Sequence, residues 1–419
     1  MKPLRLLVVF TLAFPLFAQS NAHPKHKPVT HKSAPQSAAQ VHSSAIVIDT
    51  HADTPQRMLD DHYDLTDPLD GGYLNFASAK EGNLGAEFFS IWVEPKLYEG
   101  HYARRTLELI DTVLQQAAKH PDQMMMAYSP EDIERAHREH KLAALMGIEG
   151  GHSIEDSLGL LRDYYRLGVR YMTLTWSNSN DWADSSGDAD DPRIHHTEDG
   201  LTDFGKDVVY EMNRLGMMVD ISHVSDKTFY DALANSAAPL IATHSSCRAL
   251  CDAPRNLSDQ MIRDLAAKGG VVQINFHVGF LSNKFRAARN ANPQLEQEIE
   301  ARMSEICGDK EVSQFTEAGK LIRQFAAQGR LPRVEWTEIL DHIDHAVKLV
   351  GADHVGLGSD FDGADMPYGM DDASYLPRIT GGLLQKGYCE SDIQKILGGN
   401  TLRLMQDVEA IKHKMEGTP

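Results

Sequence analysis

Along most of this chain, short apolar runs alternate with amphipathic runs, and this alternation is the strongest constraint on its fold. The apolar runs have the length and composition of buried strands, and the runs between them repeat apolar residues at helical spacing. The strand-like runs include AALMGIEGG, VRYMTLTW, MMVDISHVS, PLIATHSS, GVVQINFH and HVGLGSDFDG. A helix start is also visible, because Ser129 is followed by a proline and two acidic residues, which supply an N-cap and a favourable first turn.

Strands that alternate with helices favour a parallel sheet covered by helices. About seven or eight such units with no second linker between them fit a (β/α)8 TIM barrel, and an open doubly wound sheet is the alternative. No G-x-G-x-x-G follows a strand, so a dinucleotide site would lack its usual phosphate cradle. We therefore expect an α/β chain folded as a (β/α)8 barrel.

The composition limits the classes of partner. The chain has 419 residues, of which 42% are hydrophobic, and its 41 basic and 60 acidic residues give a net charge of −19. Such a chain can bury a large core. Its negative charge would repel a polyphosphate backbone, so we expect no nucleic-acid partner.

The N-terminal residues have the pattern of a secretory signal. Lys2 and Arg5 precede an apolar run from Leu6 to Ala18, and small residues follow it. We expect a signal peptide over residues 1–22, a flexible linker rich in Ala, Ser, Pro and His over residues 23–44, and a catalytic barrel over residues 45–415. The mature protein would then be secreted or periplasmic. Its tail shows no hydrophobic anchor signal, so we expect no membrane anchor.

Several apolar runs end in a side chain that can bind a metal. His51 and Asp53 follow AIVID, Glu149 follows AALMGI, His223 follows MMVDIS, His244 follows PLIAT, and Asp360 follows VGLGS. Barrels build their active sites at the carboxyl ends of the strands. The recurrence at equivalent ends therefore predicts that these side chains meet in one pocket.

Three histidines and two carboxylates exceed the usual three protein ligands of one catalytic zinc ion. Two ions that share a carboxylate would use them all, with His51 and Asp53 on one ion, His223 and His244 on the other, and Glu149 as the bridge. Such ions activate water and polarise a carbonyl oxygen. The pattern therefore indicates hydrolysis.

Two further residues have more than one interpretation. Asp360 is either a sixth metal ligand or the base that takes a proton from water and passes it to the leaving group, and we favour the second role. Arg255 is either a fork for a substrate carboxylate or a partner in an ion pair with Asp252 or Asp259. Spacing alone does not separate these two roles of Arg255.

The four cysteines do not indicate a structural metal site. Cys247 and Cys251 form a CxxxC pattern with no second cysteine pair nearby, so a zinc knuckle is not expected. They are either disulfide-bonded or free buried thiols.

Six stretches of the sequence resemble the renal or membrane dipeptidase family, the M19 zinc peptidases. They are IDTHADTP, GIEGGHSIEDSLGLLRDYYRLGVRYMTLT, NRLGMMVDISHVS, THSSCRAL, PRNLSD and GLGSDFDG. The resemblance spans roughly Ala45 to Met405, and we expect a bacterial member of the family.

This resemblance implies a metal-dependent hydrolase barrel that hydrolyses dipeptides, including those with a D-residue at the C-terminal side. It implies two Zn²⁺ per subunit bridged by Glu149 and a water or hydroxide, with the remaining metal ligands as assigned above. By matched position, Arg255 would hold the terminal carboxylate of the substrate and Asp360 would transfer the proton. The family likeness also favours a homodimer.

One position departs from the family pattern. Relatives have a histidine after TLT that helps to bind substrate, whereas this chain has Trp176, which cannot become a cation. Asn178, Asn180 or His152 would have to compensate, or the substrate differs. The rival functions are another binuclear amidohydrolase, acting on a lactone, cyclic amide or phosphoester, and a periplasmic binding protein that no longer turns over its ligand.

Overall fold

The computed structural model describes residues 37–187, 200–307 and 313–417. Its strands are β1 (Val47–Ala52), β2 (Leu84–Trp92), β3 (Met124–Met126), β4 (Leu142–Glu149), β5 (Val169–Thr173), β6 (Met218–Asp220), β7 (Ile241–Ala242), β8 (Val271–Ile274) and β9 (Val355–Leu357). Every strand pair in the sheet is parallel. The pairing order is β1-β2-β4-β5-β6-β7-β8-β9, with β3 attached to β4.

The two ends of this strand order meet. Ala52, at the end of β1, forms a parallel bridge with Phe361, which follows β9. The backbone N–H of Asp53 donates to the carbonyl oxygen of Phe361 over 2.8 Å, and that of Asp360 donates to the carbonyl oxygen of His51 over 3.0 Å. These contacts close the sheet into the predicted (β/α)8 barrel and exclude an open doubly wound sheet.

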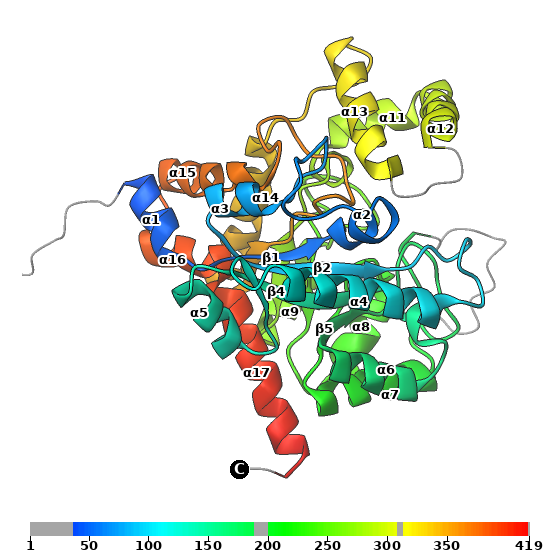
Figure 1. Ribbon diagram of the computed structural model, residues 1–419, viewed down its shortest axis with the longest axis vertical. Helices are drawn as coiled ribbons and strands as arrows, with labels where there is room; N and C mark the ends of the chain where they lie inside the picture. The colour runs from blue at the N-terminus through cyan, green and yellow to red at the C-terminus, as the bar shows by residue number, and fades with distance from the viewer. Residues whose placement is uncertain (1–36, 188–199, 308–312, 418–419) are drawn as a thin grey trace, which may run out of the picture. The chain divides into compact units, whose positions relative to one another are not determined.

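Helices surround the barrel, as Figure 1 shows around β1, β2 and β4. They are α1 (Ala38–Ser44), α2 (Thr54–Asp60), α3 (Phe76–Glu81), α4 (Tyr102–Lys119), α5 (Pro130–Arg138), α6 (Leu158–Leu167), α7 (Asp203–Leu215), α8 (Asp226–Asn235), α9 (Asp259–Ala267), α10 (Val278–Leu281), α11 (Asn283–Asn290), α12 (Pro293–Cys307), α13 (Ser313–Ala327), α14 (Thr337–Val350), α15 (Pro377–Gln385), α16 (Glu390–Gln394) and α17 (Asn400–Met415). The predicted start of α5 is confirmed, because Ser129 accepts a hydrogen bond from the backbone N–H of Asp132. In the described part of the chain, no helix has the length and apolar character needed to cross a membrane.

The predicted linker is wrong at its C-terminal end. Residues 38–44, assigned to a flexible segment, form helix α1, and Val41 and His42 are buried. The side chains of Ser37 and Gln40 cap its first turn reciprocally, and His42 hydrogen-bonds the carbonyl oxygen of Gly82. A capping box and two buried side chains therefore stabilise this helix, although the composition of the segment is that of a linker. The predicted signal peptide and the rest of the linker lie outside the described residues.

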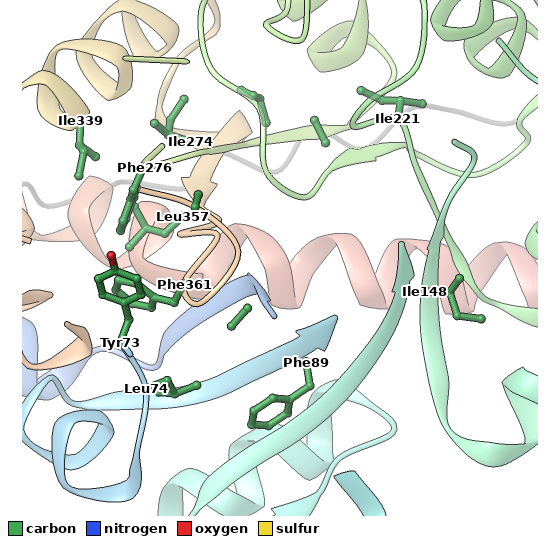
Figure 2. Packing of buried hydrophobic residues seen from close by; sticks show 14 of the residues in the cluster. Tyr73, Leu74, Phe89, Ile148, Ile221, Ile274, Phe276, Ile339, Leu357 and Phe361 are labelled. Atoms are coloured by element: carbon green, nitrogen blue, oxygen red, sulfur yellow. The ribbon is translucent and has the colours of Figure 1, made fainter. Parts of the chain in front are cut away.

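Apolar side chains from the strands fill the layer between the barrel and its helices. Figure 2 shows Phe89 of β2, Ile274 of β8 and Phe361 after β9 within this layer, and all three are fully buried. The rings of Phe276 and Phe361 meet edge to face with centroids 6.1 Å apart. This packing holds the carboxyl ends of the strands, from which the candidate site is built.

One strand pair leaves no room for an additional methyl group. Gly147 on β4 pairs with Tyr171 on β5, and a Cβ added at Gly147 would lie 1.9 Å from the Cζ atom of Tyr171. We expect Gly147→Ala to lower the free energy of unfolding by about 1–3 kcal/mol, because the ring must move within a packed core. Urea unfolding measures this difference.

Gly381 on α15 provides the matched control, because an added Cβ there meets nothing within 4 Å. Gly381→Ala is expected to leave the unfolding free energy unchanged or to raise it by about 0.4–1 kcal/mol. Equal midpoints for the Gly147→Ala variant and the parent would contradict this account of the packing.

Candidate metal centre

The structure brings the six predicted metal and acid side chains together at one end of the barrel. His51 lies near the end of β1 and Glu149 is the last residue of β4, while the other four lie in the turns that follow β1, β6, β7 and β9. These four are Asp53, His223, His244 and Asp360. All six are buried. Remote parts of the chain therefore converge as the alternation of strands and helices predicts.

Glu149 lies between the histidines, and its two oxygens face different ones. Its Oε2 is 3.3 Å from Nε2 of His51. Its Oε1 is 2.8 Å from Nε2 of His223 and 3.3 Å from Nε2 of His244. Oδ2 of Asp53 lies 3.5 Å from the same Nε2 atom of His51. The carboxylate of Glu149 therefore has the position expected of a bridge between two ligand sets.

Two overlapping groups of potential ligand atoms each lie within 4.8 Å of one another, and both include His51. One group adds Glu149 and His244, and the other adds Asp53 and Asp360. Nε2 of His51 and Oδ1 of Asp53 are buried and make no hydrogen bond to any described residue. Because buried polar atoms are normally paired, these donor atoms fit the coordination of divalent cations.

Outer hydrogen bonds orient two of the three histidine rings, those of His51 and His244. The hydroxyl group of Tyr171 donates to the carbonyl oxygen of Thr50, so Nδ1 of His51, 2.9 Å from that hydroxyl oxygen, is left to donate to it. Likewise, the hydroxyl group of Thr243 donates to Asp220 over 2.6 Å, and Nδ1 of His244 lies 2.8 Å from Thr243 Oγ1. Each of these two rings then turns its Nε2 atom to the cluster, and an outer partner on Nδ1 is typical of metal-binding histidines.

The buried environment changes the proton affinities of the cluster. Burial lowers the pKa of His223 and His244 well below the usual histidine value, so these rings are neutral and keep their lone pairs. Burial also raises the pKa of Glu149 to about 7 and raises the pKa of Asp360. Carboxylates crowded in this way favour a site that holds positive charge.

Backbone strain marks two of the six residues. His223 and Asp360 have φ angles of 66° and 67°, in the left-handed region that residues with a Cβ seldom adopt. Histidine and aspartate are among the non-glycine residue types that adopt this region more often than others. Such strain often accompanies functional sites.

Asp360 and Arg255 occupy different surroundings. Oδ2 of Asp360 accepts a hydrogen bond from Asn275 over 2.9 Å, and Asp360 lines the pocket above the cluster. Arg255 donates to Oγ of Ser245 over 2.6 Å and to the carbonyl oxygen of His244 over 2.8 Å. Among the described interactions, Arg255 forms no ion pair with Asp252 or Asp259, and Asp259 instead pairs with His345.

The cluster opens into a pocket of about 140 Å³. It is lined by Asp53, Trp92, Glu149, Trp176, Ser177, His223, His277, Phe280, Asp360, Gly363 and Ala364. Trp176 therefore lies at the site, as the sequence predicts. Arg255 is not among the lining residues, but its guanidinium carbon is 5.6 Å from the ring centroid of Phe280, which lines the pocket.

None of the three residues proposed to compensate for Trp176 lines this pocket. Oδ1 of Asn180 accepts from two backbone N–H groups of its own turn, and the amide group of Asn178 donates to Ser179. His152 hydrogen-bonds the carbonyl oxygen of Val93, and burial lowers its pKa to about 4. His152 is therefore neutral and does not replace a cationic histidine.

Six lining residues were not among the predicted site residues, namely Trp92, Ser177, His277, Phe280, Gly363 and Ala364. For His277 the sequence offers a signal. This residue follows the apolar run GVVQINF, so the rule that identified the other histidines also applies to it. His195 and His196 lie outside the described residues.

Cys247 and Cys251 are free, buried thiols rather than a disulfide. The Sγ atom of Cys247 is 3.5 Å from the carbonyl oxygen of His342, and that of Cys251 is 3.5 Å from the carbonyl oxygen of Gly279. Burial raises the pKa of both thiols. Their surroundings are those of packing residues.

Comparison with known proteins identifies the family. The sequence matches the membrane dipeptidase family, peptidase family M19, over residues 35–418. Dipeptidase tcpJ of Claviceps purpurea (strain 20.1) is 34% identical over 370 residues, which cover 86% of this chain and 74% of that protein. Dipeptidase 3 of Mus musculus is 32% identical over 349 residues, and the chain spans 60% of that protein's length.

Among solved structures, the probable dipeptidase PvdM from Pseudomonas aeruginosa superimposes with a TM-score of 0.75 at 28% identity. The match covers 89% of this chain and 98% of that chain. The family match therefore extends over almost the whole sequence, and the likeness includes the barrel that carries the candidate metal centre. This chain belongs to the membrane dipeptidase family, the metallodipeptidases of peptidase family M19.

Proposed function

We propose that this protein hydrolyses dipeptides with two zinc ions, one held by His51 and Asp53, the other by His223 and His244, and both by Glu149. The observation that carries this proposal is the contact of the two Glu149 oxygens with histidines on different sides. When bound, zinc would polarise the scissile carbonyl group and lower the pKa of water.

Asp360 is the proposed proton carrier. Its Oδ2 is engaged by Asn275, so we assign the transfer to Oδ1. Oδ1 takes a proton from the attacking water and delivers it to the nitrogen of the leaving amine, which restores the carboxylate. The position of Asp360 in the pocket lining supports this role.

Arg255 is the proposed partner of the substrate's terminal carboxylate. Burial lowers the pKa of Arg255 to about 10, so the guanidinium group still carries its charge at neutral pH. Its two hydrogen bonds to Ser245 and His244 fix its orientation beside the cluster. We assign Trp176 to substrate contact as well, because it lines the pocket.

We also propose that the enzyme accepts dipeptides with a C-terminal D-residue. We further propose that it acts in the periplasm or outside the cell after its signal peptide is removed, and that it forms a homodimer.

The test of function is a panel of L-Xaa-L-Xaa and L-Xaa-D-Xaa dipeptides, tripeptides and lactones, with zinc measured on the same samples. We expect dipeptide cleavage and two zinc ions per chain. Equal cleavage of tripeptides would contradict the dipeptidase assignment. Ligand binding without turnover would support a binding protein instead.

The hydrogen bond between Tyr171 and His51 supplies a prediction about metal affinity. We expect Tyr171→Phe to weaken zinc binding by about 10–100-fold, because an outer partner that orients a metal-binding histidine is removed. Competition with a zinc chelator measures the change. Tyr164→Phe is the control, since it removes a buried hydroxyl group that donates to Ser153 and contacts no cluster residue. Equal zinc affinity in the two variants would contradict the orienting role of Tyr171.

A further inference from the structure

We propose that the tryptophan side of the pocket receives the side chain of the substrate's first residue and selects apolar side chains over acidic ones. This inference rests on the proposed dipeptidase function and adds the substrate class. In this proposal Trp92 helps to determine substrate specificity, and so does Trp176, which stands where relatives have a histidine.

The two tryptophans form one continuous aromatic wall. Trp92 is the last residue of β2 and pairs in register with Glu149 on β4, whereas Trp176 lies in the loop after β5. Their ring centroids are 4.9 Å apart at an interplanar angle of 51°. Both line the pocket, and the ring of Trp176 is centred 6.3 Å from that of His223. A side chain lying on this wall is therefore beside the proposed metal ligands.

The barrel order determines which half of the substrate meets this wall. In the closed order, three strands separate β2 from β7 in either direction, so their carboxyl ends face each other across the barrel. Arg255 follows β7, and Phe280, which follows β8, packs over its guanidinium group. If Arg255 holds the terminal carboxylate, the second residue lies on that side. The first residue then lies toward Trp92 and Trp176.

The pocket lining offers an acidic side chain no cationic side-chain partner. Asp53, Glu149 and Asp360 are among its lining residues, and none of those lining residues is a lysine or arginine. His277 supplies no positive charge, because burial lowers its pKa to about 3. The proposed zinc ions would be held by their own ligands, including Asp53 and Glu149. A carboxylate on the aromatic wall would lose its water without gaining a lysine or arginine partner among the lining residues, which is costly.

The test uses the full chain loaded with zinc and dipeptides of the form Xaa-Ala, with Gly, Leu, Phe, Gln or Glu in the first position. We expect kcat/KM for Leu-Ala and Phe-Ala to exceed that for Gly-Ala by at least about tenfold, the usual discrimination of an apolar pocket. Gln and Glu have the same shape, and we expect at least about tenfold slower cleavage of Glu-Ala because only its charge differs. Rates that agree within threefold across the panel would overturn the inference while leaving the dipeptidase function intact.

Variants test whether the tryptophan side of the pocket produces the preference for an apolar first residue. We expect Trp176→Ala to reduce the advantage of Phe-Ala over Gly-Ala by about tenfold with zinc content unchanged, and Trp176→Phe to retain most of it. Tyr210→Ala is the control, because this aromatic side chain on α7 is 60% exposed and does not line the pocket. An unchanged preference in Trp176→Ala would overturn the assignment. Failure of the parent to cleave any dipeptide would instead reject the proposed function and this inference together.

Discussion

Glu149→Gln is expected to abolish dipeptide hydrolysis and to leave less than one zinc ion per chain. The carboxylate faces His51 through one oxygen and His223 through the other, so both proposed ions depend on it. An amide retains the shape but loses the charge and turns a donor group toward a cation. Removal of an outer partner of a metal ligand already lowers metal affinity or activity by about 10–100-fold. We therefore expect removal of a ligand shared by two ions to lower activity by about 10³-fold or more.

Glu87 offers a matched control for this substitution. It lies on β2, is fully buried, and neither of its carboxyl oxygens has a hydrogen-bond partner among the described residues. Burial raises its pKa well above the usual value, so the group is neutral and an amide is a close substitute. Glu87→Gln should retain two zinc ions and activity within about threefold of the parent, since it removes no proposed ligand. A Glu149→Gln variant with normal zinc content and turnover would refute the bridging role.

Asp360→Asn is expected to lower kcat by about 10²–10⁴-fold while leaving two zinc ions bound, because an amide cannot accept the proton that general base catalysis requires. Turnover and zinc content must be measured on one preparation, since together they separate the two roles of Asp360. Loss of zinc would identify Asp360 as a sixth ligand, in agreement with its place beside His51 and Asp53. Normal turnover would exclude both roles.

Asp362 is the control for that experiment. It lies in the same loop and is buried, but it accepts hydrogen bonds from Thr54 and from the backbone N–H of Tyr73 and does not line the pocket. Asp362→Asn should lower the free energy of unfolding by about 1–3 kcal/mol, because a buried partner is disrupted. Its kcat should change by less than about threefold, because Asp362 has no place in the proton transfer. A large loss of kcat in this variant would show that loop integrity, rather than proton transfer, explains the effect at Asp360.

Much of the fold follows from the sequence because its patterns are periodic. Apolar runs that alternate with amphipathic runs determine a parallel barrel, and polar residues at the ends of those runs must then meet at one face. That logic placed His51, Glu149 and His244 together although they are distant in the sequence. The same rule applies to His277, which also follows an apolar run and lines the pocket.

The remaining features depend on tertiary contacts that a single sequence does not encode locally. Helix α1 has the composition of a linker, yet its buried His42 bonds Gly82, which is distant in the chain. Trp92 has the apolar character of a core residue. Only the fold shows that its ring packs against Trp176 and that the two rings together form one side of the pocket. Sequence spacing did not separate the two roles of Arg255, binding a substrate carboxylate or pairing with Asp252 or Asp259. Only the fold shows that Asp259 pairs with His345 and not with Arg255.

The proposed centre consists of two metal ions held by one shared carboxylate, and anomalous X-ray scattering at the zinc edge tests this most directly. Crystals of the zinc-loaded protein should show two anomalous peaks per chain, both in contact with Glu149, one beside His51 and Asp53 and the other beside His223 and His244. A single peak, or peaks remote from Glu149, would contradict the proposed centre.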